Sequence, residues 1–138
     1  MSYNLFLDDD PKRIPHKLSW IDLPLVEWVI VRNYDEFVKT ILRDSMPKII
    51  SFDHDLSKTA YDEFFRSKEK MEDINYNNIV EKTGFDCAKW VANYCIDKNI
   101  NLPDYYIHTL NDQGALNIFS ILESARKIIE LNVTKTKI

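Results

Sequence analysis

Three consecutive carboxylates follow an apolar run near the start of the chain. The stretch LFLDDDPKR places Asp8, Asp9 and Asp10 directly after residues that have the pattern of a buried strand. Adjacent carboxylates repel one another, and a metal ion or a basic side chain usually offsets that repulsion. A solvated turn is the alternative interpretation, because Asp-Pro is also typical of turns.

Polar groups that suit the same chemistry follow three further apolar runs. In chain order they are Arg32 and Asn33, then Asp53, His54 and Asp55, and finally His108, Thr109 and Asn111. Clustered carboxylates bind hard divalent cations such as Mg²⁺ or Mn²⁺, and imidazole binds metals or transfers protons near neutral pH. These residue types indicate a metal site with groups for proton transfer, provided that the fold brings them together.

Strands that alternate with helices are predicted from the apolar patterns. The predicted strands are 3–7, 26–33, 49–52 and 104–111. Pro15 and Pro24 interrupt the segment between the first two strands, which is expected to form a short helical turn and a loop. The segments between the later strands carry helical signals.

Capping residues mark where the helices begin. Asn33 predicts the start of a first helix, which Pro47 ends. Thr83, with Asp86 at the third helical position, predicts the start of a second one. Apolar residues at helical spacing predict a final amphipathic helix over 112–131.

Two segments are less regular in pattern. Residues 57–82 are polar and charged, and we expect a partly helical excursion there. Within it, Tyr61, Phe64 and Phe65 could cover a nucleobase. The tail, 132–138, is expected to be either frayed or a short edge strand.

This order of elements predicts an α/β domain over residues 1–138. We expect a flavodoxin-like three-layer sandwich, with a mostly parallel sheet of four to five strands and helices on both faces. Ligands of such sheets bind beyond the carboxyl ends of the strands. Because all four predicted strands end in polar groups, those ends should form one polar rim, which favours a functional site over a solvated turn.

The metal ligands are expected among the acids of this rim. Side chains alternate along a strand, so not all of the acids can converge on one ion. We expect Asp9, Asp10 and Asp53 to bind the cation, with Mg²⁺ or Mn²⁺ as the metal. Asp8 is either a helix-capping or surface acid or a further member of the group.

The histidines and arginines of the rim each have two possible roles. His54 and His108 either ligate a metal or transfer protons, or they are structural. Arg32 and Arg13 either bind phosphate through a bidentate fork or form salt bridges with the acids.

Two further residues follow the fourth predicted strand. Thr109 could donate its hydroxyl to a phosphate oxygen, and Asn111 could orient a ligand oxygen, cap the final helix, or do both.

Composition narrows the classes of function. A net charge of −4 argues against non-specific nucleic-acid binding, and the two glycines form no phosphate-binding loop motif.

Cys87 and Cys95 lie eight positions apart in a predicted helix, about 12 Å along its axis, which is too far for a disulfide. They indicate buried thiols in a reducing compartment. With no signal-peptide pattern and no long apolar run, we expect a cytoplasmic protein without membrane contact. Three tryptophans, Trp20, Trp28 and Trp90, are expected in the core.

The motifs LFLDDD and ISFDHDL resemble those of the receiver domains of two-component signalling. Receivers carry paired acids after their first strand and a phospho-accepting Asp after their third, with Mg²⁺ bound between them. Asp9, Asp10 and Asp53 match these places, and Thr109 matches a Ser/Thr after the fourth strand. The Lys that receivers carry after a fifth strand has no counterpart here, which argues against phosphotransfer switching.

A closer resemblance is to the cyclic-phosphate processing receiver-like family, which includes phage and bacterial proteins. It is carried by LFLDDDPKR, VIVRNYDEF, ISFDHDL, TGFDCAKW and IHTLNDQGALNI together. The resemblance implies a receiver-type fold whose rim binds metal and handles cyclic or terminal phosphates of nucleotides or RNA. The residues carried over are Asp9, Asp10, Arg32, Asp53, His54, Asp55, His108 and Asn111.

The function that this implies is a metal-dependent phosphoesterase that acts on cyclic phosphates. Asp55 or His54 would take the proton of the attacking water, and His108 would protonate the leaving oxygen. Arg32 and Asn111 would steady the non-bridging oxygens. The alternative is a non-catalytic protein that binds a nucleotide or a protein partner, such as a phage accessory or anti-defence protein in the host cytoplasm.

Overall fold

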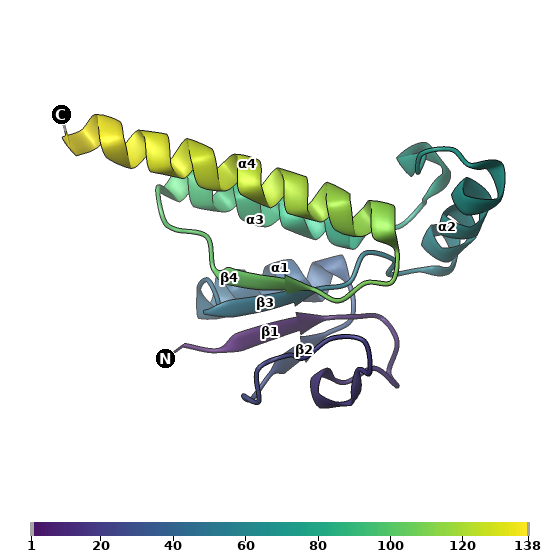
Figure 1. Ribbon diagram of the computed structural model, residues 1–138. Coiled ribbons are helices and arrows are strands. Elements are labelled where there is room, and N and C mark those ends of the chain that lie inside the picture. The colour runs from purple at the N-terminus through teal and green to yellow at the C-terminus, as the bar shows by residue number, and fades with distance from the viewer. Residues whose placement is uncertain (1, 138) are drawn as a thin grey trace.

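The computed structural model describes residues 2–137, which form a four-stranded parallel sheet covered by helices (Figure 1). The strands are β1 (Asn4–Leu7), β2 (Val29–Val31), β3 (Ile49–Phe52) and β4 (Asp104–Ile107). Their order in the sheet is β2-β1-β3-β4, and every neighbouring pair is parallel. The predicted flavodoxin-like α/β class is therefore confirmed.

Three helices lie on one face of the sheet, and the helix that follows β3 extends from the carboxyl ends of the strands (Figure 1). The helices are α1 (Tyr34–Asp44), α2 (Lys58–Lys70), α3 (Gly84–Lys98) and α4 (Asp112–Lys137). Asn33 caps α1, and Thr83 with Asp86 forms a capping box on α3, as predicted. Between α2 and α3, the 3₁₀ turn η2 (Tyr76–Asn78) completes the excursion.

The tail differs from both alternatives that the sequence left open. Helix α4 continues as far as Lys137, so residues 132–137 are neither frayed nor an edge strand. The physical reason is that no Gly or Pro follows Leu131 to stop the helix. Ile138 lies outside the described residues.

The core lies between the sheet and helices α1, α3 and α4. Alternation along the strands directs Leu5 and Leu7 of β1 into this core, with Ile50 and Phe52 of β3 beside them. Both cysteines are buried on α3 as free thiols, as the sequence predicted. Burial raises the pKa of Cys95 to about 11, so this thiol stays protonated and unreactive at neutral pH.

The opposite face of the sheet is covered by the segment between β1 and β2. Phe6 points to this face, where its ring meets that of Trp28 at 6.3 Å. The indole Nε1–H of Trp20 donates to the carbonyl of His108 at 2.7 Å, although Trp20 itself is 41% exposed rather than in the core as expected. In this segment the 3₁₀ turn η1 (Pro15–Lys17) is the short helical turn that we expected, so the helical layer expected on this face is reduced to a single turn, because closely spaced prolines disfavour a longer helix.

The register of the sheet brings the ends of all four strands to one edge, as predicted. Leu7 pairs with Phe52 of β3 and with Val31 of β2, and Phe52 pairs with Ile107 of β4. Backbone hydrogen bonding continues one residue further, with the amide of Asp53 donating to the carbonyl of Leu7 at 3.0 Å. The residues that follow the strands therefore lie side by side.

Both glycines of the chain pack against the turn that follows β3. A Cβ on Gly84, the first residue of α3, would lie 1.7 Å from the carbonyl oxygen of Asp53. A Cβ on Gly114, in the first turn of α4, would lie 2.4 Å from Cγ of His54. The glycines therefore allow two helix N-termini to approach the site closely, which is a use unrelated to a phosphate-binding loop.

Replacing Gly84 by Ala should destabilise the fold because the added methyl group meets rigid backbone. We expect Gly84→Ala to lower the free energy of unfolding by about 3 kcal/mol or more, measured by urea denaturation. Ser120→Ala, at an exposed position on α4, is the matched control and should change it by less than about 0.5 kcal/mol. Equal unfolding midpoints for Gly84→Ala and the wild type would contradict this close packing.

Candidate functional site

Three ionisable residues from three strand ends meet inside the protein. Asp8 follows β1, Asp53 follows β3 and His108 follows β4, and all three are buried. Each offers one ligand atom, and these atoms lie within 4.8 Å of one another. The group could hold a metal ion. Asp8 and His108 already touch, with Oδ2 of the carboxylate 3.0 Å from Nε2 of the ring.

His108 is held in place on every side. Its ring stacks on Phe6 with centroids 4.5 Å apart, and its Nδ1 lies 2.7 Å from the hydroxyl of Ser51. Burial lowers the pKa of His108 below its ordinary value, while the hydrogen bond with Asp8 acts in the opposite direction. The Ser51 hydroxyl can accept a hydrogen bond from Nδ1–H, and the lone pair of Nε2 is then available to a metal.

One carboxylate oxygen of Asp53 is buried without a hydrogen-bond partner among the described residues, which indicates a ligand site. Its Oδ1 accepts a hydrogen bond from the amide of His54 at 2.8 Å, but its Oδ2 is buried and has no hydrogen-bond partner among the described residues. Burial, and then the charge of Asp8, raise the pKa of Asp53 well above its ordinary value, against the opposing effects of Arg13 and Thr109. A cation beside Oδ2 would satisfy this atom, so the residues present fit a divalent metal.

The two arginines of the rim have different roles. Nη1 of Arg13 lies 3.6 Å from Oδ2 of Asp8, and its Nε lies 4.0 Å from Oδ2 of Asp10, which is the salt-bridge alternative that the sequence left open. Nη1 of Arg32 instead donates to the carbonyls of Asp8 and Asp10 at 3.0 and 2.7 Å. Arg32 therefore fixes the backbone that carries the acids.

Asp9 and Asp10, two of the three expected ligands, lie outside the buried group. Oδ1 of Asp9 accepts a hydrogen bond from the hydroxyl of Tyr61 at 2.9 Å, and burial raises the pKa of Asp9. Oδ1 of Asp10 accepts one from the amide of Lys12 at 2.9 Å. Asp53 is in the group as expected, and Asp8 stands where the other two were predicted.

The alternation of side chains along β1 could have predicted from the sequence that Asp8 belongs to this group. Its amide still hydrogen-bonds to the carbonyl of Val31 at 3.1 Å, so the strand pattern extends to this residue. Counting in steps of two from Phe6 places Asp8 on the same face as that ring. Ser51 and His108 lie on this face as well, which explains why Asp8 meets His108.

A second cluster surrounds His54. Its Nδ1 lies 2.6 Å from Oδ1 of Asp55, and its Nε2 lies 2.8 Å from the hydroxyl of Tyr76 in the excursion. Nδ2 of Asn111 donates to Oδ1 of Asp55 at 3.1 Å, while its Oδ1 accepts from the amide of Gly114 and so caps α4. These polar atoms are paired with one another inside the protein, so the cluster fastens the excursion to the helices.

The excursion also reaches the rim directly. The hydroxyl of Tyr61 donates to Asp9, whereas Phe65 is 64% exposed and contacts Phe64. Of the three aromatic residues that the sequence offered as a cover, Tyr61 is the one that contacts a rim acid. Thr109, which was expected to face phosphate, accepts a hydrogen bond from the amide of Asn111 at 3.2 Å.

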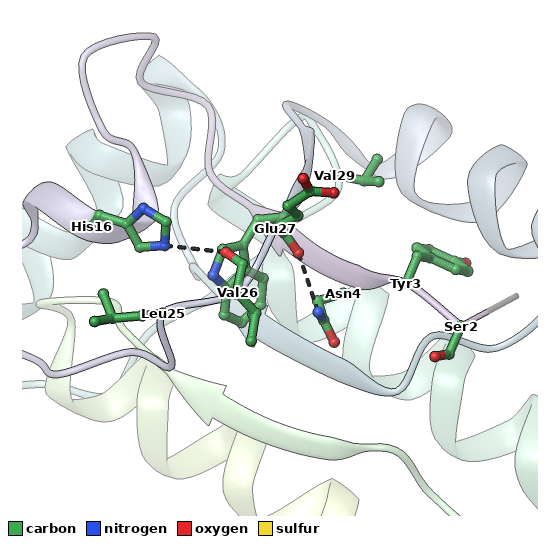
Figure 2. A pocket seen from close by; sticks show the side chains of 9 residues that line it. Ser2, Tyr3, Asn4, His16, Leu25, Val26, Glu27 and Val29 are labelled. Carbon is green, nitrogen blue, oxygen red and sulfur yellow. Dashed lines mark hydrogen bonds between the residues drawn. The ribbon is translucent and has the colours of Figure 1, made fainter.

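A cavity of about 750 Å³ lies away from the rim, beside the amino end of β1 (Figure 2). Figure 2 shows the side-chain Nδ2 of Asn4 donating to the carbonyl of Glu27, and Nε2 of the His16 ring hydrogen-bonded to the carbonyl of Val26. Apolar side chains such as Leu25 line much of the remainder. None of the rim acids contributes to this lining, so the cavity is separate from the candidate site.

Comparison with protein families identifies the family of the chain. Residues 3–124 match the family model of the cyclic-phosphate processing receiver domain. The chain belongs to this family. The resemblance that the motifs indicated is thus confirmed, and membership in it supports a phosphate-bearing ligand for this receiver domain. Searches of curated proteins and of solved structures found no match. Among the helices described for this receiver domain, none has the length and apolar character needed to cross a membrane.

Asp53→Asn should separate metal binding from stability. Without metal, the free energy of unfolding of this variant should exceed that of the wild type by on the order of 1 kcal/mol, because one of two facing buried charges is gone. Saturating Mn²⁺ or Mg²⁺ should raise the Tm of the wild type by about 5 °C or more but leave the variant unchanged. Asp10→Asn is the matched control and should retain the wild-type shift. A shift kept in Asp53→Asn would contradict a metal site at this residue, and a shift lost in both variants would instead support the ligands expected from sequence, Asp9, Asp10 and Asp53.

The raised pKa of Asp53 also predicts a pH dependence for the metal-free protein. The folded state binds the Asp53 proton more tightly than the unfolded chain, so the free energy of unfolding falls as the pH rises from the ordinary value of 3.8 through the raised one. The stability advantage of Asp53→Asn over the wild type should therefore increase with pH in urea denaturation. A constant difference across this range would contradict it.

Proposed function

We propose that the protein hydrolyses cyclic phosphates of nucleotides or of RNA ends, with a divalent cation held by Asp8, Asp53 and His108. The observation that carries this proposal is the buried Oδ2 of Asp53, which has no hydrogen-bond partner among the described residues. Membership in the cyclic-phosphate processing family supplies the substrate class. Two carboxylates and one imidazole suit Mn²⁺ better than Mg²⁺, because Mg²⁺ prefers oxygen ligands throughout.

A cation held by Asp8, Asp53 and His108 would supply Lewis acidity, which would offset phosphoryl charge and lower the pKa of water. In the reaction, a water oxygen forms a bond to phosphorus and one ester P–O bond of the ring breaks. The water loses a proton and the leaving oxygen gains one, so a cyclic diester and water give a phosphate monoester with a free hydroxyl.

The protein's own groups divide the remaining tasks. Asp9 lies at the rim, bonded to Tyr61 and partly exposed, and its carboxylate is the group that accepts the proton of the attacking water. The leaving oxygen takes its proton from solvent. His54 and Asp55 satisfy each other inside the protein, which supports a positioning role for them rather than the proton transfer expected from sequence.

Asn111 and Arg32 act through their neighbours in the same way. Asn111 is bonded to Asp55 and to the first turn of α4, so it supports the turn that carries Asp53. Arg32 holds the backbone of the acidic segment through its carbonyls. Neither needs to touch the substrate for its removal to lower activity.

The test is turnover of defined cyclic substrates in the presence of Mn²⁺ or Mg²⁺. The panel contains 2′,3′-cyclic nucleotides, 3′,5′-cyclic nucleotides and an RNA oligonucleotide with a 2′,3′-cyclic phosphate end. We expect the wild type to open at least one class to a monoester, detected by chromatography. Asp53→Asn and His108→Gln should each lower the rate by about 100-fold or more, because each removes a ligand of the cation.

Asp62→Asn is the matched control, since this acid is exposed on α2 and pairs with Lys58 outside the site. It should retain the wild-type rate. A wild type that binds metal but turns over none of the panel would overturn the hydrolase proposal. It would favour the alternative, a non-catalytic receiver domain that binds a nucleotide or a protein partner, as in a phage accessory protein. Buried free thiols suit a cytoplasmic setting in either case.

A further inference from the structure

Arg13 is a partly buried cation whose hydrogen-bonding groups are free. Its side chain is 24% exposed, and its two ionic contacts, with Asp8 at 3.6 Å and Asp10 at 4.0 Å, are too long for hydrogen bonds. No residue in the described range 2–137 accepts a hydrogen bond from its guanidinium group. A guanidinium carries five N–H donors in a planar fork, so this group is available to an oxyanion.

A closed ring of contacts ties Arg13 to the candidate metal centre. Cζ of Arg13 lies 5.3 Å from the ring centroid of Trp20, and Nε1–H of Trp20 donates to the carbonyl of His108 at 2.7 Å. The His108 ring then contacts Asp8, which in turn lies beside Arg13. Trp20 is therefore a fixed platform that keeps the guanidinium plane next to the buried acids.

Arg32 provides the contrast within the same rim. Its Nη1 donates to main-chain carbonyls, including those of Asp8 and Asp10, and so is already used by the protein. The resemblance between motifs pointed to Arg32 as the phosphate-binding arginine. The contacts favour Arg13 for that task, because none of its guanidinium N–H groups donates to an acceptor among residues 2–137, whereas Nη1 of Arg32 donates to three main-chain carbonyls.

We propose that Arg13, held on Trp20, binds the phosphate group of the ligand beside the cation site. The identity of that ligand as a cyclic phosphate rests on the proposed function, whereas phosphate binding by Arg13 does not depend on turnover. In the metal-free protein, Arg13 offsets the charge of Asp8. A cation held by Asp8 and Asp53 would offset that charge instead, which would leave the guanidinium N–H groups of Arg13 to the phosphate oxygens.

Binding of inorganic phosphate, measured by calorimetry in the presence of Mg²⁺, tests this assignment. Arg13→Gln should weaken the affinity by about tenfold or more, because it removes charge-assisted hydrogen bonds. Lys12→Gln is the matched control, since it removes an exposed positive charge one residue away, and should change the affinity by less than about twofold. Arg13→Lys keeps the charge without the fork and should lie between them.

Two further measurements exclude a merely structural effect. Free guanidinium ion should restore phosphate binding to Arg13→Ala. It would not do so if the variant had lost binding because its site was misfolded. Phosphate should also change the tryptophan fluorescence of the wild type, and Trp20→Phe should abolish that change, because the anion binds to the guanidinium that lies on the indole of Trp20.

The outcomes separate this inference from the proposed hydrolysis. Arg13→Gln that binds phosphate as the wild type does, or a wild type that binds none, would overturn the assignment of Arg13. An equal loss in Lys12→Gln would overturn it too, because general surface charge would then explain the binding. If affinity falls in Arg13→Gln while no cyclic substrate is opened, the assignment stands and the hydrolase proposal fails. If the wild type opens a cyclic substrate but Arg13→Gln binds phosphate with unchanged affinity, the hydrolase proposal stands and the assignment of Arg13 fails.

Discussion

Two buried carboxylates that face each other, Asp8 and Asp53, are the constraint around which the rest of the site is arranged. Neither side chain can be moved away, because the pairing of β1 with β3 sets their separation. Water does not reach them to screen the repulsion, so protein groups or a ligand must do so. Arg13 and His108 approach Asp8, while the outer oxygen of Asp53 is left without a partner. This arrangement of charges could hold a cation.

The surroundings keep this unfavourable arrangement rigid. On one side, His54, Asp55 and Asn111 satisfy one another and join the turn after β3 to α4 and to the excursion. On the other side, two glycines let the first turns of α3 and α4 close on the same turn. A packed shell of this kind prevents Asp53 from relaxing away from Asp8, which would otherwise be the easiest way to relieve the charge.

The segment between β1 and β2 has a double role. It covers the face of the sheet that helices α1, α3 and α4 leave open, with Trp28 against Phe6. It also delivers Arg13 and Trp20 to the rim, where Trp20 is bonded to the main chain of His108. Arg13 and Trp20 therefore come from the same irregular segment that covers the sheet, and neither belongs to a regular helix or strand.

The sequence by itself determined the strands, the capped helices and the polar rim, because residue periodicity and capping act over a few neighbouring positions. Local pattern also predicted the buried thiols of Cys87 and Cys95. The tertiary structure decided which acids converge: Asp8 rather than Asp9 or Asp10 joins Asp53, since strand alternation had to be counted from a register that pairing alone defines. It likewise separated Arg13 from Arg32, and revealed why both glycines are needed, because contacts between residues distant in the chain leave no local pattern.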